Sequence, residues 1–144
     1  MLVTFRPCGP KDHKALLKLI VAYYRFDKIR YDLRSLSRGL DTLLRNLSLG
    51  QAWLIENHKH PVGYTLLTYN FDLEYGGMEG MLTEVYVEKR YRNHGVGTLA
   101  LYEVEDFCRE RGIRNQYPGG GGYAGMVYDI AYGRAMLQSA LLLK

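Results

Sequence analysis

The sequence predicts an α+β fold, with a mixed, mainly antiparallel sheet flanked by helices. The main observation is the order of the expected elements: a strand, two helices, three strands and another helix, without the repeated strand–helix alternation of a doubly wound sheet. The length of 144 residues and the hydrophobic content of 47% suit one globular domain over residues 1–144. The two cysteines, Cys8 and Cys108, indicate no disulfide framework.

The first half of the chain is expected to form one strand and two helices. Residues 2–6 alternate apolar and polar side chains, as a half-buried strand does. Pro10 and Asp12 suit the first turn of a helix. Asp32 can cap a second helix, which Gly50 would end. The expected apolar stripes are Leu16, Leu17, Leu19, Ile20 and Tyr23 in the first helix and Leu33, Leu36, Leu40, Leu43, Leu44 and Leu47 in the second.

Three strands are predicted next, at residues 52–56, 62–71 and 81–87, because these segments are rich in strand-forming residues. A helix should follow from about Gly95 to Gly112. Simple alternation in the last strand places Leu82, Glu84 and Tyr86 on one face and Thr83, Val85 and Val87 on the other.

The segment from Arg92 to Gly97 has the pattern R-x-x-G-x-G between a strand and a helix. The first amides of a helix have no intrahelical partner and carry partial positive charge, so they bind phosphate. Gly95 and Gly97 remove side chains that would obstruct the approach, and Arg92 can reach phosphate oxygens. Glycines at a strand-to-helix turn are more often needed only for the backbone conformation of the turn. The position of this motif directly between a strand and a helix nevertheless favours a pyrophosphate site.

A resemblance to a known family is carried by residues 81–113, MLTEVYVEKRYRNHGVGTLALYEVEDFCRERGI. This segment resembles the acetyl-coenzyme A binding motif of the GNAT N-acetyltransferase superfamily, [QR]-x-x-G-x-[GA]. The resemblance extends over residues 1–114 and is nearest to the small diamine-acetyltransferase-like branch. It implies a GNAT-like fold and transfer of an acetyl group from acetyl-CoA to a primary amine of a small molecule or peptide, without a metal.

The resemblance also implies roles for individual residues. Glu84 would be the general base that deprotonates the amine, although a solvated strand carboxylate is the plain alternative. Thr83 stands where diamine enzymes have a second acid, which argues against a diamine substrate. Val85 and Val87 would pair through their backbones with the pantetheine arm, and the amide of Val85 would polarise the thioester carbonyl. The residues expected at the pyrophosphate are Arg92, Asn93, His94, Gly95, Val96, Gly97 and Thr98.

Residues 115–144 depart from the family pattern. The segment YPGGGGYAG stands where a fifth strand belongs, so we expect that strand to be missing or improvised and the C-terminal part to be atypical or incomplete. A possible last helix follows, and Tyr128 or Tyr132 would have to replace the family's acid tyrosine. The abrupt change at Asn115 has two explanations: a shifted reading frame, or a native tail that packs on the edge of the fourth strand or on a second copy.

Charge and composition bear on the partners. The net charge of +4 favours an anionic partner, and the cluster of Lys89, Arg90 and Arg92 favours a local phosphate site over a nucleic-acid surface. No apolar run has the length of a membrane span, and the start of the chain lacks the features of a signal peptide. We therefore expect a cytoplasmic protein that binds neither nucleic acid nor membrane. An uncovered strand edge invites pairing with a second copy, so we also expect a homodimer. The alternative function is a catalytically weak or inactive GNAT-fold module for acyl-CoA binding or association.

Overall fold

The computed structural model describes residues 2–116 of the chain. The strands are β1 (Val3–Pro7), β2 (Gly50–Asn57), β3 (His60–Asp72), β4 (Gly77–Val87) and β5 (Arg114–Gln116). The α-helices are α1 (His13–Phe26), α2 (Leu33–Arg45) and α3 (Val96–Glu110), with short 3-10 turns at Pro10–Asp12 and Lys89–Tyr91. Among the described residues, no helix is both long and apolar enough to span a bilayer.

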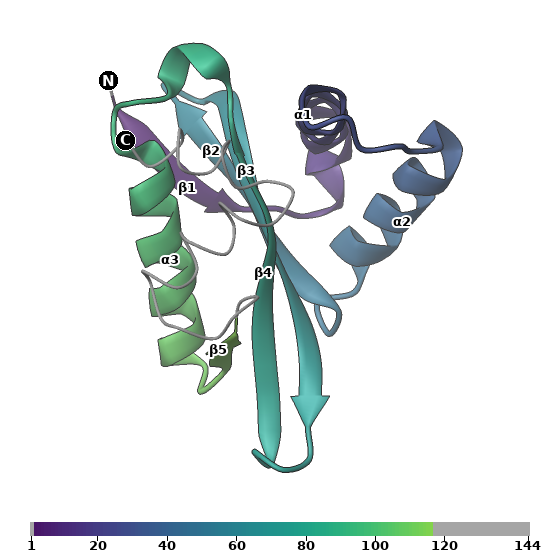
Figure 1. Ribbon diagram of the computed structural model, residues 1–144, viewed down its shortest axis with the longest axis vertical. Helices are drawn as coiled ribbons and strands as arrows, with labels where there is room; N and C mark the ends of the chain where they lie inside the picture. The colour runs from purple at the N-terminus through teal and green to yellow at the C-terminus, as the bar shows by residue number, and fades with distance from the viewer. Residues whose placement is uncertain (1, 117–144) are drawn as a thin grey trace.

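The strands form one sheet in the order β1-β2-β3-β4-β5. The pairs from β1 to β4 are antiparallel, and β4 pairs in parallel with β5. Helices α1 and α2 lie on one face of the sheet and α3 covers the other, while the β3–β4 hairpin extends beyond both layers (Figure 1). The predicted α+β fold class, with its mainly antiparallel sheet and flanking helices, is confirmed.

Each face of the sheet has its own hydrophobic core. On one face α3 packs through Val96, Ala100, Leu101, Val104 and Cys108 on Trp53, Ile55, Val62, Leu67, Leu82, Val85 and Val87. On the other, α1 and α2 pack through Leu16, Leu19, Ile20, Tyr23, Leu40 and Leu44 on Ala52, Leu54, Tyr64 and Tyr86. The predicted helix stripes account for most of the helical residues in these cores.

A bulge in β4 changes which side chains share a face. Leu66 of β3 pairs with Glu84, but the next residue, Leu67, pairs with Leu82, so Thr83 is the extra residue in this ladder. Leu82 therefore joins Val85 in the core beneath α3, whereas Glu84 faces the layer of α1 and α2. The prediction that Leu82 and Glu84 share a face was wrong, because simple alternation does not allow for an inserted residue.

A short fifth strand is present just before the segment YPGGGGYAG, where the sequence predicts a missing or improvised strand. Arg114–Gln116 pairs with Glu79–Met81 of β4. The guanidinium of Arg114 forms ion pairs with Glu79 and, at 3.4 Å, with Asp72, which hold the start of this strand against the hairpin. The glycine run, the possible last helix, and Tyr128 and Tyr132 lie outside the described residues.

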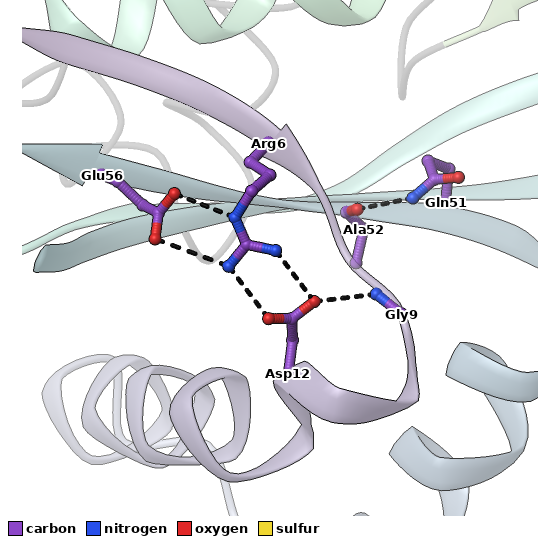
Figure 2. Close-up of polar contacts among 6 residues, drawn as sticks. All are labelled: Arg6, Gly9, Asp12, Gln51, Ala52 and Glu56. Atoms are coloured by element: carbon purple, nitrogen blue, oxygen red, sulfur yellow. Dashed lines mark hydrogen bonds and ion pairs between the residues drawn. The ribbon is translucent and has the colours of Figure 1, made fainter. Parts of the chain in front are cut away.

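A network of charged side chains joins β1, β2 and the start of α1 (Figure 2). Arg6 donates to Asp12 through both terminal nitrogens, at 2.9 and 3.1 Å, and through Nε to Glu56 at 3.0 Å. Asp12 also accepts the backbone N–H of Gly9 at 2.9 Å. Both carboxylates are buried, so Arg6 balances their charge and fixes the entry into α1.

Candidate active site

The loop before α3 is shaped by two left-handed residues. Asn93 has φ of 66° and Gly95 has φ of 75°, a region that glycine enters without steric cost. A Cβ built on Gly95 would meet no atom within 4 Å among the described residues. No described side chain caps α3, and its first helical bond runs from the Leu99 N–H to the Gly95 carbonyl, at 3.1 Å. The amides of the first turn therefore face space that a phosphate can enter.

Arg92 lies differently from the expectation that its side chain reaches phosphate oxygens. The side chain is only 7% exposed, and its Nε donates to the Val87 carbonyl at 2.7 Å. Its guanidinium carbon lies 4.7 Å from the Phe26 ring centre and 5.5 Å from that of Tyr86. Burial lowers the pKa of Arg92 from its usual value, and Nη2 has no hydrogen-bond partner in the described part of the chain. The side chain thus ties the loop to the ends of β4 and α1.

His94 also contacts the loop itself. Its Nδ1 lies 2.7 Å from the carbonyl oxygen of Arg92 and 3.3 Å from that of Tyr91. The ring therefore braces the turn that contains Asn93. Of the residues predicted at the pyrophosphate, His94 and Arg92 shape the loop with their side chains, while Gly95 to Thr98 supply the start of α3.

The backbone of β4 presents Val85 and Val87 to the side away from β3. The Glu88 N–H donates to the Val62 carbonyl at 2.8 Å. Hydrogen-bonded and non-bonded residue pairs alternate in an antiparallel ladder. The backbone of Tyr86 therefore bonds to β3, and the backbone N–H and carbonyl groups of Val85 and Val87 point away from β3. On that side, the described part of β5 reaches only Met81. The Val87 carbonyl accepts the hydrogen bond from the Arg92 side chain. The groups that this edge presents to a ligand are then the N–H and carbonyl of Val85 and the N–H of Val87.

Glu84 is a buried carboxylate held by two tyrosines. Its Oε2 accepts from the Tyr24 hydroxyl and its Oε1 from the Tyr64 hydroxyl, each at 2.6 Å. Glu84 is 9% exposed and Tyr64 is fully buried, so this is no solvated strand carboxylate. Burial and the charge of Glu84 raise the pKa of Tyr64 well above its ordinary value, which keeps its hydroxyl protonated as a donor.

The two tyrosines were missed in the sequence analysis. Tyr24 lies on α1, 60 residues before Glu84, and Tyr64 lies 20 residues before it. The sequence offered no local signal for either contact, because the first depends on how α1 lies across the sheet and the second on the register of β3 and β4. Most tyrosines of this sequence lie at apolar positions of helices and strands, where hydrophobic packing is the default interpretation.

Glu84 lies at a cavity of about 700 Å³ bounded by α1, α2 and the sheet. Its volume is within the range typical of small-molecule sites, about 300–1,000 Å³. The wall is largely aliphatic, with tyrosines and a few polar side chains beside the carboxylate. It is formed by Ile20, Tyr24, Arg30, Tyr31, Asp32, Ser35, Leu36, Gly39, Leu40, Leu43, Leu49, Leu66, Thr68 and Glu84.

Comparison with protein families identifies the chain. Residues 14–117 match the family model described as Acetyltransferase (GNAT) family. The match covers more than half of the chain, and it includes the loop before α3, Glu84 and the exposed edge of β4. The protein belongs to the GNAT family of acetyltransferases.

Solved structures share this fold. An integron cassette protein from the mobile metagenome of Cole Harbour Salt Marsh is 30% identical, with a TM-score of 0.74 over 78% of this chain and 74% of that one. A possible acetyltransferase from Clostridium difficile 630 is 19% identical, with a TM-score of 0.76 over 90% and 88% of the two chains. A predicted acetyltransferase from Clostridium acetobutylicum, solved with acetyl-CoA, is 19% identical, with a TM-score of 0.72 over 92% and 89%. No curated protein sequence matches the chain.

Proposed function

We propose that this protein transfers the acetyl group of acetyl-CoA to the primary amine of a small molecule or peptide. The observation that carries the proposal is the placement of Glu84, a buried carboxylate on β4, on the strand that leads into the uncapped start of α3. Membership of the GNAT family supports acetyl transfer from acetyl-CoA. The geometry supports the proposal with a buried carboxylate that can serve as a base and a cavity that can hold the amine.

The residues fit acetyl-CoA in two ways. The first turn of α3, from Val96 to Thr98, would hold the pyrophosphate through backbone amides, since Gly95 places no Cβ in front of them. The backbone of Val85 and the N–H of Val87 would accept the pantetheine arm as a strand edge does, and the Val85 amide would polarise the thioester carbonyl. In this arrangement Arg92 and His94 hold the loop in shape from within.

Glu84 would act as the general base. An ammonium group must lose a proton before its nitrogen can form the new C–N bond, and the carboxylate can take that proton directly or through a water. When the C–S bond of the thioester breaks, the thiolate of CoA leaves, and its low basicity lets it do so without an acid. Tyr24 and Tyr64 keep the carboxylate oriented while it accepts the proton.

The test combines calorimetry with acetyl-CoA and a thiol-release assay over a panel of primary amines. Glu84→Gln keeps the shape of the side chain and should lower kcat about 100-fold with unchanged acetyl-CoA affinity. Glu74→Gln, an exposed control on the β3–β4 turn, should leave both unchanged. Binding of acetyl-CoA without turnover of any amine would instead favour the alternative of an acyl-CoA-binding module. Absence of acetyl-CoA binding would refute both.

The homodimer and the cytoplasmic location remain predictions from the sequence. Light scattering that shows a monomer at high protein concentration would refute the homodimer.

A further inference from the structure

The cavity beside Glu84 differs in character from end to end. Ile20, Leu36, Leu40, Leu43 and Leu66 give it an aliphatic body. Tyr24 bonds to Glu84 through its hydroxyl, and the ring of Tyr31 lies next to that of Tyr24, with the ring centres 6.0 Å apart in an edge-on arrangement. The cavity therefore has one polar, aromatic end and one aliphatic end.

Charge within the lining is unevenly distributed. Arg30 and Asp32 are both exposed, they carry opposite charges, and Asp32 is occupied in capping α2 through the Ser35 N–H at 2.9 Å. Among the described residues that line the cavity, Glu84 is the only buried charged one. One buried negative charge matches one ammonium group, which can donate charge-assisted hydrogen bonds to it.

The far end has no charged partner for a second ammonium group within the described lining. Thr68 lies two residues beyond Leu66 on β3, about 7 Å further from the Glu84 end. Around it stand Leu43 and Leu49. Thr68 and Leu43 are half-buried and Leu49 is 43% exposed, so a cation placed there would keep part of its hydration but would gain no charged partner in the described lining. An alkyl or aryl group would instead gain contact with the leucines.

We infer that the acceptor is a small primary monoamine with an apolar body, whose ammonium group lies at Glu84 and whose hydrocarbon part lies along the leucines of α2 and β3. This inference rests on the proposed function, since it names the substrate class of the same site. It excludes diamines as preferred acceptors and disfavours peptides, whose polar backbone would follow the amine into the aliphatic end.

The test compares hexylamine with pentamethylenediamine, which have equal numbers of non-hydrogen atoms and differ in a terminal methyl or ammonium group. We expect hexylamine to show a kcat/KM at least about ten-fold higher. Calorimetric titration with each amine alone should give the same order of affinity. This binding arm does not require turnover, and acetyl-CoA binding is measured separately, so failure of acetyl transfer and failure of the inference are distinguishable. Equal or better use of pentamethylenediamine, or of trialanine, would overturn the inference.

A charge placed at the far end provides a second test. Thr68→Asp adds a carboxylate where the diamine's second ammonium group would lie, and it should reduce the preference for hexylamine at least about ten-fold. Thr42→Asp makes the same substitution on the exposed side of α2, outside the lining, and should leave the preference unchanged. Thermal unfolding of both variants checks that the fold is retained. An equal preference for hexylamine in wild type and Thr68→Asp would contradict the placement of the apolar body. If Thr68→Asp does not fold, the comparison of the two amines in the wild type decides alone.

Discussion

Tyr64 on β3 donates a 2.6 Å hydrogen bond to Glu84 on the neighbouring strand β4. Tyr64 pairs in register with Tyr86, and Glu84 pairs with Leu66, so the bond crosses the strand pair diagonally. Glu84 shares this face with Tyr86 by plain alternation, while the bulge at Thr83 turns Leu82 to the other face. The orientation of the proposed base therefore depends on a buried hydroxyl of the neighbouring strand.

Tyr64→Phe removes that hydroxyl without changing the ring. We expect kcat to fall about ten-fold, with a loss of about 1–2 kcal/mol in the free energy of unfolding, because the buried carboxylate loses a donor. Acetyl-CoA affinity should not change. Tyr69→Phe is the control, since Tyr69 lies on the same strand but packs on the α3 side. Steady-state kinetics and urea unfolding measure both effects, and an unchanged kcat in Tyr64→Phe would show that the bond has no catalytic role.

Gly95→Ala should weaken acetyl-CoA binding at least about ten-fold, because the new methyl group enters the space in front of the first amides of α3. Alanine at positive φ is also strained by about 1–2 kcal/mol. Gly112→Ala separates the two effects. Gly112 follows the same helix with φ of 65° and an equally open surrounding, so the strain is similar while the affinity should stay unchanged. Calorimetry that finds equal losses in both variants would contradict the pyrophosphate site.

The sequence predicted the element order and the loop before α3 because both depend on local signals. Asp32 accepts the Ser35 N–H at the start of α2, as its capping role predicted. Gly95 has the positive φ that a turn into α3 requires. The prediction that Gly50 ends the second helix was wrong, because α2 ends at Arg45 and Gly50 begins β2. Gly50 lies so close to β3 that a Cβ there would clash with the Leu67 carbonyl.

Features that depend on contacts between distant segments were not predicted. The inward turn of Arg92 requires Phe26, which is brought near by the packing of α1 on the sheet. The bulge at Thr83 has no glycine or proline to mark it in the sequence. The start of β5 depends on the ion pair of Arg114 with Glu79, 35 residues earlier. Local sequence patterns therefore led to the proposed site, whereas the orientation of its individual side chains depends on contacts between distant segments.

Arg6→Met should lower the free energy of unfolding by about 2–3 kcal/mol at neutral pH, because it leaves the buried carboxylates of Asp12 and Glu56 unpaired. This expected loss is at the low end of the range for buried ion pairs, because the Arg6 side chain is 38% exposed. Arg45→Met, which breaks only the exposed pair with Asp41, should cost less than about 0.5 kcal/mol. Urea unfolding of the two variants measures the difference.

This network should also contribute to acid stability. Burial alone would raise the pKa of Asp12, but the hydrogen bonds from Arg6 and the Gly9 N–H hold it below its usual value. The native state therefore binds fewer protons than the unfolded state near pH 4, and the stabilisation present above that pH is lost as the pH falls. The difference in the free energy of unfolding between wild type and Arg6→Met should therefore become smaller below about pH 4. A difference that stays constant would mean that Arg6 acts through packing alone.

The two thiols should be protected from reagents in the folded protein. Cys8 and Cys108 are free and buried, and burial raises their pKa values to about 12 and about 11, from an ordinary value of 9.0. Thiol reagents attack the thiolate, so labelling at pH near 8 should be slow in the native state and rapid in urea. This protection also keeps the protein's own thiols from contributing to a thiol-release assay. Labelling as rapid as that of the unfolded chain would contradict the burial of both residues.

The same burial predicts a loss of stability at alkaline pH. As the pH rises through about 9, the unfolded chain releases both thiol protons while the native state retains them, so the free energy of unfolding falls. Each thiol contributes up to about 1.4 kcal/mol per pH unit until its native pKa is reached. Cys108→Ala removes one contribution, and its slope between about pH 9 and pH 10.5 should be smaller than that of wild type by this amount. Urea unfolding across this range measures the slopes, and equal slopes would show that Cys108 titrates alike in the folded and unfolded chain.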